Sequence, residues 1–203
     1  MRKNVKKQLA LRVLSTAALL AMVSSIATAA FAERYDLNTG SVTVETKDDG
    51  ITYVTQKNTD INNHPDDTGV TITSNGTQTS NTITVETADK QTTNVTLENV
   101  HIESSSAWSS DPAPIEIKGN GNTNLELNGN NIVLSGNSEH AGIEKADKYG
   151  TGTLTIKDNV NNDGKLLAGG FDNSAGIGGG GTHDTARTSN ITITAVSYTH
   201  LTL

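Results

Sequence analysis

Hydrophobic and polar residues alternate in short segments along most of this chain. Val, Ile or Leu occupies every second position of a segment, and Thr, Glu or Asn fills the positions between them. This alternation places the apolar side chains on one face of a β-strand and the polar side chains on the other. The pattern predicts strands at 41–46, 51–56, 70–73, 82–87, 94–97, 115–117, 125–127, 132–134, 154–156 and 191–194.

Turn-forming dipeptides separate these segments. They are Asn-Gly, Asp-Gly, Gly-Asn and Gly-Gly, whose residues accept the positive φ that a sharp corner requires. No segment after residue 32 has a helical period. The sequence therefore predicts an all-β protein.

Similar strand units recur at intervals of about one circuit of a coiled fold. Val95, Leu125 and Leu154 begin comparable strands 30 and 29 residues apart. Three Ala-x-Ile elements end at Ile115, Ile143 and Ile177, which are 28 and 34 residues apart. Such spacing is typical of a solenoid, and a two-sheet sandwich is the alternative. We expect parallel β-helix repeats over 51–194, preceded by a lead-in or cap over 33–50.

The composition favours a narrow interior. Hydrophobic residues make up 33% of the chain and aromatic residues only 3%. Stacked Val, Ile, Leu and Ala fill a narrow coil, whereas a sandwich needs bulkier side chains between its sheets. We therefore expect Tyr and Trp to lie mostly outside. The absence of cysteine excludes disulfides, thiol catalysis and Cys-based zinc sites.

The N-terminal segment differs from the rest of the chain. A basic start is followed by an apolar stretch over 13–26 and by Ala30-Phe31-Ala32. This order is typical of a secretory signal peptide over 1–32, with Ala30 and Ala32 before the cleaved bond and Glu33 after it. An uncleaved membrane anchor is the alternative. Loss of five basic residues changes the formal net charge from −7 to −12, which argues against binding nucleic acid.

Two acidic motifs could belong to the active site of a β-helix hydrolase. Asn58-Thr59-Asp60 and Asp66-Asp67 resemble parts of the polygalacturonase site, but they are too close to lie on successive coils, and no Gly-His-Gly follows. A lyase needs a basic residue near its substrate, and the only arginines after residue 32 are Arg34 and Arg187. We interpret the acidic segment as a solvated loop and expect no catalytic residues.

A metal site has one weak candidate. Asn159, Asn161 and Asp163 alternate like the first oxygen donors of a calcium loop. The twelfth position is Gly170 instead of Glu, so a tight turn is the favoured interpretation, and Ca²⁺ is the only ion that the segment suggests. The Glu139-His140 pair is interpreted as carrying a surface histidine.

Exposed aromatic residues are the usual platform for sugar rings. Trp108 and Asp111 lie in a polar insertion between two predicted strands, and Tyr149 lies in a second loop. We predict that these three residues contact carbohydrate. Alternatively, Trp108 folds back over a coil edge.

Several segments together resemble one protein family. It comprises the secreted right-handed β-helix proteins of gut Firmicutes that are described as carbohydrate-binding or adhesin-like. The resemblance covers about 69–194 and implies a right-handed coil, a surface location and contact with glycans, but it transfers no catalytic residue. The segments that carry it are 81–85, 94–102, 125–131, 141–143 and 175–180.

The last nine residues do not fit this family. Residues 195–203 match the translation of a transposase sequencing adapter, so we expect a non-native tail on a truncated chain. The expected protein is a secreted, non-catalytic, adhesin-like module that binds glycan or a host or cell-surface polysaccharide and is attached to the cell wall through a region beyond Thr194. A β-helix lyase or hydrolase and a purely structural stalk are the alternatives, and the sequence fixes no oligomeric state.

Overall fold

The computed structural model describes residues 32–104, 112–137, 139–159, 161–182, 185–194 and the backbone of 197–202. Strands account for 49% of the chain and helix for 2%, which confirms the all-β prediction. One short 3-10 helix, η1, spans Asp147–Tyr149. In these described ranges, no helix is long and apolar enough to cross a membrane.

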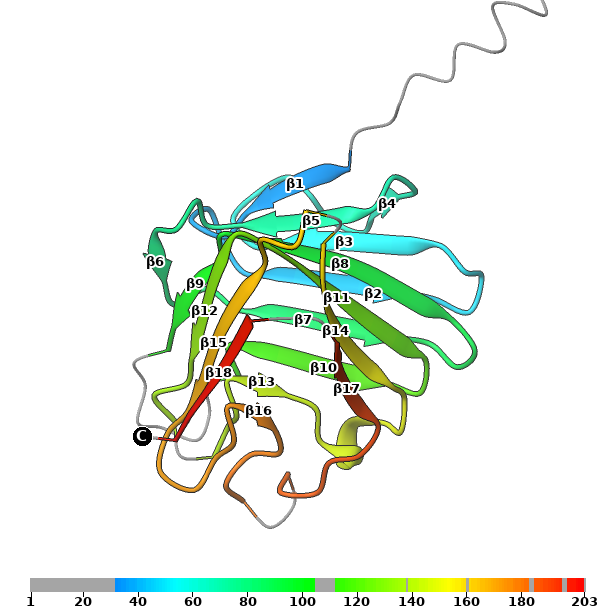
Figure 1. Ribbon diagram of the computed structural model, residues 1–203. Coiled ribbons are helices and arrows are strands. Elements are labelled where there is room, and N and C mark those ends of the chain that lie inside the picture. Colours follow the sequence, from blue (N-terminus) through cyan, green and yellow to red (C-terminus); the bar gives the residue numbers. More distant parts are fainter. Residues whose placement is uncertain are drawn as a thin grey trace, which may run out of the picture. The chain divides into compact units, whose positions relative to one another are not determined.

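The strands form three sheets, here called A, B and C (Figure 1). Sheet A has the order β1 (Glu33–Asp36), β5 (Val70–Thr73), β8 (Thr92–Glu98), β11 (Asn122–Asn128), β14 (Leu154–Asp158) and β17 (Ile191–Thr194). Sheet B has the order β16 (Ile177–Gly178), β13 (Ile143–Glu144), β10 (Ile115–Gly119), β7 (Ile83–Thr87), β2 (Val42–Thr46), β3 (Thr52–Gln56) and β4 (His64–Asp66). Sheet C has the order β18 (Ser197–Thr202), β15 (Lys165–Gly170), β12 (Asn130–Leu134), β9 (His101–Glu103) and β6 (Gln78–Thr79).

From β5 onward the chain visits sheets A, C and B in an unbroken rotation. We call one passage through the three sheets a circuit. Each strand pairs in parallel with the strand of the same sheet in the next circuit, from β5 with β8 to β15 with β18. Residues distant in sequence therefore become lateral neighbours along every sheet.

The register confirms most of the predicted repeat alignment. Val95 pairs with Leu125, and Ile143 pairs with both Ile115 and Ile177. The alignment of Leu154 with Leu125 is wrong, because Ile156 is the partner of Leu125. Leu154 and Ile156 are both fully buried, so a shift by two residues keeps the same face inward and the alternation alone cannot detect it.

The N-terminal part contains the only antiparallel pairing among the described strands. β1 and β2 pair in parallel with β5 and β7, as later strands do with their neighbours. β3 then turns back on β2, and β4 turns back on β3, so both pairings are antiparallel. This hairpin extends sheet B beyond the circuits, and β4 forms the edge.

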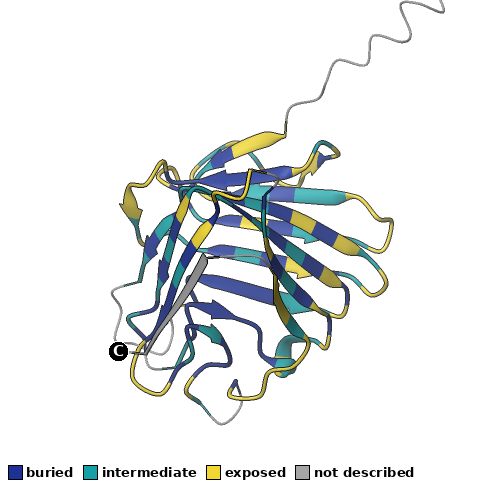
Figure 2. Cartoon of the chain, in the orientation of Figure 1, coloured by how far each residue is buried: buried dark blue, intermediate teal, exposed yellow. Residues whose placement is uncertain are grey.

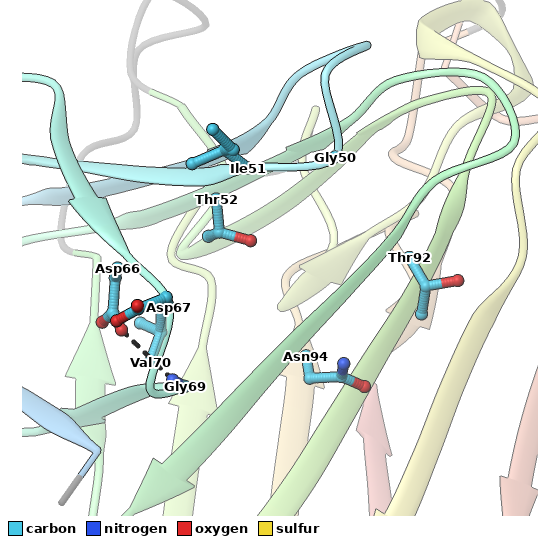
Figure 3. Close-up of a pocket in the computed structure, with 9 residues that line it drawn as sticks. All are labelled: Gly50, Ile51, Thr52, Asp66, Asp67, Gly69, Val70, Thr92 and Asn94. Carbon is cyan, nitrogen blue, oxygen red and sulfur yellow. Dashed lines mark hydrogen bonds between the residues drawn. The ribbon is translucent and has the colours of Figure 1, made fainter. Parts of the chain in front are cut away.

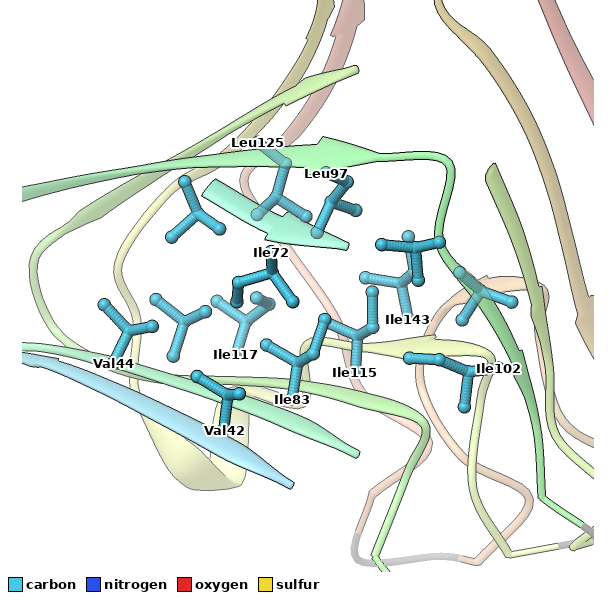
Figure 4. Packing of buried hydrophobic residues seen from close by; sticks show 14 of the residues in the cluster. Val42, Val44, Ile72, Ile83, Leu97, Ile102, Ile115, Ile117, Leu125 and Ile143 are labelled. Atoms are coloured by element: carbon cyan, nitrogen blue, oxygen red, sulfur yellow. The ribbon is translucent and has the colours of Figure 1, made fainter. Parts of the chain in front are cut away.

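Apolar β-branched residues and leucines fill the space between the sheets. Burial alternates along the strands in Figure 2, as the hydrophobic pattern requires. Figure 4 shows Ile83, Ile115 and Ile143 from adjacent strands of sheet B facing Leu97 and Leu125 of sheet A. Because stacked aliphatic side chains fill this interior, few aromatic residues are needed.

Tyr35 is an exception to the expectation that tyrosines lie outside. Its side chain belongs to the core and is only 1% exposed. Its hydroxyl lies 2.8 Å from Oε2 of Glu33 and 3.2 Å from Oδ2 of Asp66, so its polar end has partners. Burial first, and then these carboxylates, raise the pKa of the Tyr35 phenol. The expectation fails because β1 is a paired core strand whose inward position is Tyr35.

Glycines stack on one another at the corner that connects sheet B to sheet A. A Cβ atom on Gly152 would collide with the carbonyl oxygen of Gly121, and one on Gly150 would collide with that of Gly119. Gly119 and Gly150 also have positive φ values of 89° and 142°. Glycine is required here because successive circuits approach backbone to backbone.

Candidate functional site

A cavity of about 320 Å³ opens where the β3–β4 hairpin meets the outer face of sheet A. Thr92 and Asn94 of β8 are exposed, whereas the intervening Thr93 is buried, so the cavity lies outside the core. Figure 3 shows residues of three segments around it. The lining comprises Gly50, Ile51, Thr52, Asp66, Asp67, Gly69, Val70, Thr92 and Asn94.

A second cavity of about 160 Å³ adjoins the first. The two share Gly69, Val70 and Asn94, and the second extends across β8 and β11 to β14. We call the two cavities together the sheet A groove. The remaining lining of the second cavity is Ala32, Thr68, Val95, Thr96, Asn124, Glu126 and Lys157.

The parallel register builds the polar floor of the groove. Asn94 pairs with Asn124, and Thr96 pairs with Glu126, on adjacent strands. The side-chain amide of Asn124 donates to Oδ1 of Asn94 at 2.8 Å. Within the described ranges, the other two polar atoms of this pair, Nδ2 of Asn94 and Oδ1 of Asn124, form no hydrogen bond. The amide NH2 group of Asn94, with its two donors, and the acceptor Oδ1 of Asn124 therefore remain available on neighbouring circuits.

The two adjacent aspartates of the groove have different environments. Asp66 is 5% exposed, and its Oδ1 accepts from the backbone N–H of Thr68 at 2.9 Å and of Gly69 at 3.1 Å. Its Oδ2 atom faces Tyr35. Asp67 is exposed, and no described residue forms an ion pair or hydrogen bond with it. Asp66 holds the turn into β5, and Asp67 is the free carboxylate.

Glycoside hydrolysis sets a geometric requirement on the carboxylates of the groove. That reaction requires two carboxylates at a fixed separation across the sugar, one as the acid and one as the base or nucleophile. In the groove, Asp66 is occupied by the turn, and Glu126 forms an ion pair with Lys157 at 3.0 Å. Asp67 has no second free carboxylate beside it among the lining residues.

Of the sugar-contact residues predicted from the sequence, only Tyr149 is described, and it does not line this groove. Trp108 and Asp111 lie outside the described residues. Tyr149 is part of η1, which packs against β10 of sheet B. Its ring lies 5.3 Å from Nζ of Lys118 and 5.7 Å from Nζ of Lys148, measured from the ring centroid. Burial, followed by two nearby carboxylates, raises the pKa of the Tyr149 phenol.

The calcium candidate forms a closed turn between β14 and β15. The side-chain amide of Asn159 donates to Oδ1 of Asp163 at 2.8 Å, and Oδ1 of Asn159 accepts the backbone N–H of Asn161 at 2.9 Å. Asn162 completes the turn with a φ of 54°. No group of three His, Cys, Asp or Glu suited to a metal exists among the residues that the structure describes.

The predicted cleavage site spans the beginning of the described chain. Ala30 lies outside the described residues. Ala32 is exposed and contributes to the smaller cavity of the groove, and Glu33 is the first residue of β1.

Sequence reasoning missed a buried polar cluster on the outer side of sheet B. The interpretation of His140 as a surface histidine is wrong, because its side chain is only 13% exposed and its Nδ1 lies 2.9 Å from Oε2 of Glu144. Glu144 is fully buried, and its register partner Glu116 is bound by Lys118 at 2.8 Å. The recurring Ile-Glu dipeptides at 115–116 and 143–144 were the available signal. Lateral pairing places their carboxylates side by side.

A further cavity of about 410 Å³ lies at the turns after β2 and β7. Glu45, Asp48, Glu86 and Asp89 line it together with Lys47. Lys47 lies 3.7 Å from Glu45 and 4.3 Å from the centroid of the Tyr53 ring, so its charge is already engaged. Glu45 and Glu86 are register partners on β2 and β7, whereas Asp48 and Asp89 lie in the turns that follow these strands.

Comparison with known proteins adds no assignment: no family model, curated protein or solved structure matches this chain.

Proposed function

We propose that this chain is a secreted, non-catalytic module with a right-handed parallel β-helix fold, which binds carbohydrate through the sheet A groove. The rotation of strands through sheets A, C and B, with parallel pairing between circuits, supports the coil. Its hand follows from the family resemblance and from the general preference of parallel crossovers for the right-handed connection. A signal peptide over 1–32 and a location at the cell surface complete the proposal.

The observation that carries the binding proposal is the ordered polar floor of the groove. Sugars are recognised through hydroxyl groups that both donate and accept hydrogen bonds. Asn94 offers a free NH2 group and Asn124 offers a free carbonyl oxygen on adjacent strands. Such strands lie about 4.8 Å apart, which is close to the length of one pyranose unit. A glycan lying across the strands therefore meets equivalent polar groups on consecutive circuits.

The groove also has an apolar edge. Ile51 is 43% exposed and lies beside Thr52 on the rim of the larger cavity (Figure 3). Carbohydrate rings have C–H faces that gain from apolar contact, so an exposed Ile beside polar groups suits a sugar ring. No aromatic residue lines the groove in the described ranges.

The proposal is tested with the purified chain on a panel of immobilised polysaccharides, followed by calorimetric titration of the best ligand. The double variant Asn94→Ala/Asn124→Ala is expected to weaken binding about 5- to 150-fold, because two hydrogen-bonding groups of ordinary strength are lost. Asn130→Ala is the matched control, since Asn130 is an exposed asparagine on β12 of sheet C. Binding to no polysaccharide, or equal binding by the double variant, would contradict the proposal.

A further inference from the structure

The charged side chains of the sheet A groove bear on whether it suits acidic, neutral or basic glycans. The groove contains one cation, Lys157, and its Nζ lies 3.0 Å from Oε2 of Glu126. Asp66 is buried and bonded to its own turn, and Asp67 is exposed without a partner. The only unpaired and accessible charge among the lining residues is therefore the negative charge of Asp67.

The arginine outside the groove on the same face is not available to an acidic sugar. Carboxylate and sulfate groups are best recognised by the planar fork of arginine. Arg34 of β1 directs both terminal nitrogens at Glu98, at 2.8 and 2.9 Å, so its fork is occupied. Arg187 lies beside η1, where its carbonyl accepts from the backbone of Asp147. Arg34 is therefore paired, and Arg187 is not among the lining residues of the groove.

We infer that the sheet A groove selects glycans without acidic groups and prefers sugars with a free, protonated amine. This inference rests on the proposed function. An ammonium group near Asp67 gains a charge-assisted interaction, and it displaces no existing pair because Asp67 has none. A uronate at the same position meets like charge from Asp67, and it must break the Glu126–Lys157 pair to find a cation.

The size of the preference follows from the exposure of Asp67. Exposed ion pairs change affinity by about 1.4- to 5-fold, and salt weakens them. We expect oligosaccharides of glucosamine to bind tighter than those of N-acetylglucosamine by about this factor. Oligogalacturonate of the same length is expected to bind more weakly than both. The difference between the amine and the acetylated sugar should shrink in high salt.

The test is a calorimetric titration of these three oligosaccharides, matched in length, at a pH where the sugar amine is protonated. Asp67→Asn is expected to reduce the affinity for the glucosamine oligomer to that for the acetylated one. Asp60→Asn removes the same charge from an exposed position that does not line the groove, and it should leave the order unchanged.

A second variant tests the inference in the opposite direction. Glu126→Gln leaves Lys157 without its carboxylate, and we expect the affinity for oligogalacturonate to increase. Oligogalacturonate binding as tightly as the other sugars to the unmodified chain would overturn the inference. An unchanged preference in Asp67→Asn would also overturn it. In both cases the proposed function would stand, whereas failure of all three sugars and of every polysaccharide would remove the proposed function itself.

Discussion

Asp66 and Asp67 show how neighbouring residues of one type acquire different roles. Asp66 lies at the end of β4, where its carboxylate accepts two backbone N–H groups and faces the buried Tyr35. Asp67 follows it in the turn and points to solvent. The sequence suggested an acidic loop, but only the fold separates the residue that holds the turn from the one available to a ligand.

His140 gives the molecule a predictable dependence on pH. Its hydrogen bond to Glu144 raises the pKa of His140 above its usual 6.5, although burial acts in the opposite direction. A raised pKa in the folded state means that protonation stabilises the fold. This contribution is complete below about pH 6.5 and is lost as the pH rises through the folded-state pKa.

Urea unfolding at several pH values tests this prediction. The free energy of unfolding of the unmodified chain should exceed that of His140→Gln most at acidic pH, and the difference should shrink above about pH 6.5. His64→Gln is the control, because His64 is exposed on β4. A difference that is constant over the whole range would show that His140 contributes only by packing.

At the scale of elements, the corner between sheets B and A depends on glycine. Gly152→Ala places a methyl group against the carbonyl oxygen of Gly121 in the preceding circuit. Overpacking at a site that cannot move costs about 1–3 kcal/mol, and we expect a loss of this size in the free energy of unfolding. Ser80→Ala, a change at an exposed turn, should stay within about 0.5 kcal/mol. Equal stability of the two variants in urea would contradict the stacked corner.

The ten segments predicted as strands all coincide with strands of the structure, because each depends on its own alternation. The prediction missed eight further described strands, several of them only two or three residues long: β1, β4, β6, β9, β13, β15, β16 and β18. Segments such as 70–73 and 191–194 coincide with β5 and β17. The register was less accessible: Leu154 and Ile156 both face inward, so the pattern does not distinguish two alignments that differ by two residues.

The candidate site was not predictable from the sequence. Asn94 and Asn124 are 30 residues apart and become neighbours only through the register of β8 and β11. The hairpin that closes one side of the groove depends on the antiparallel pairing of β3 and β4, which the parallel repeat pattern does not contain. The sequence pointed to aromatic residues instead, because a single Trp or Tyr can be recognised as a possible sugar contact without knowing its neighbours in the fold.

For the molecule as a whole, the repeated circuits explain both the composition and the proposed activity. Aliphatic residues stack inside, so a chain with 3% aromatic residues forms a continuous core. The same repetition aligns polar residues outside. We therefore propose that one structural periodicity supplies both the stability of the coil and a regular surface for a polymeric ligand.

The most direct test of this account is an NMR titration that follows the side-chain amides of asparagine during addition of a bound oligosaccharide. The Nδ2 resonances of Asn94 and Asn124 should shift and saturate together, while that of Asn130 on sheet C stays unchanged. Saturable binding with shifts confined to residues outside the sheet A groove, for example around Tyr149, would contradict binding in the groove.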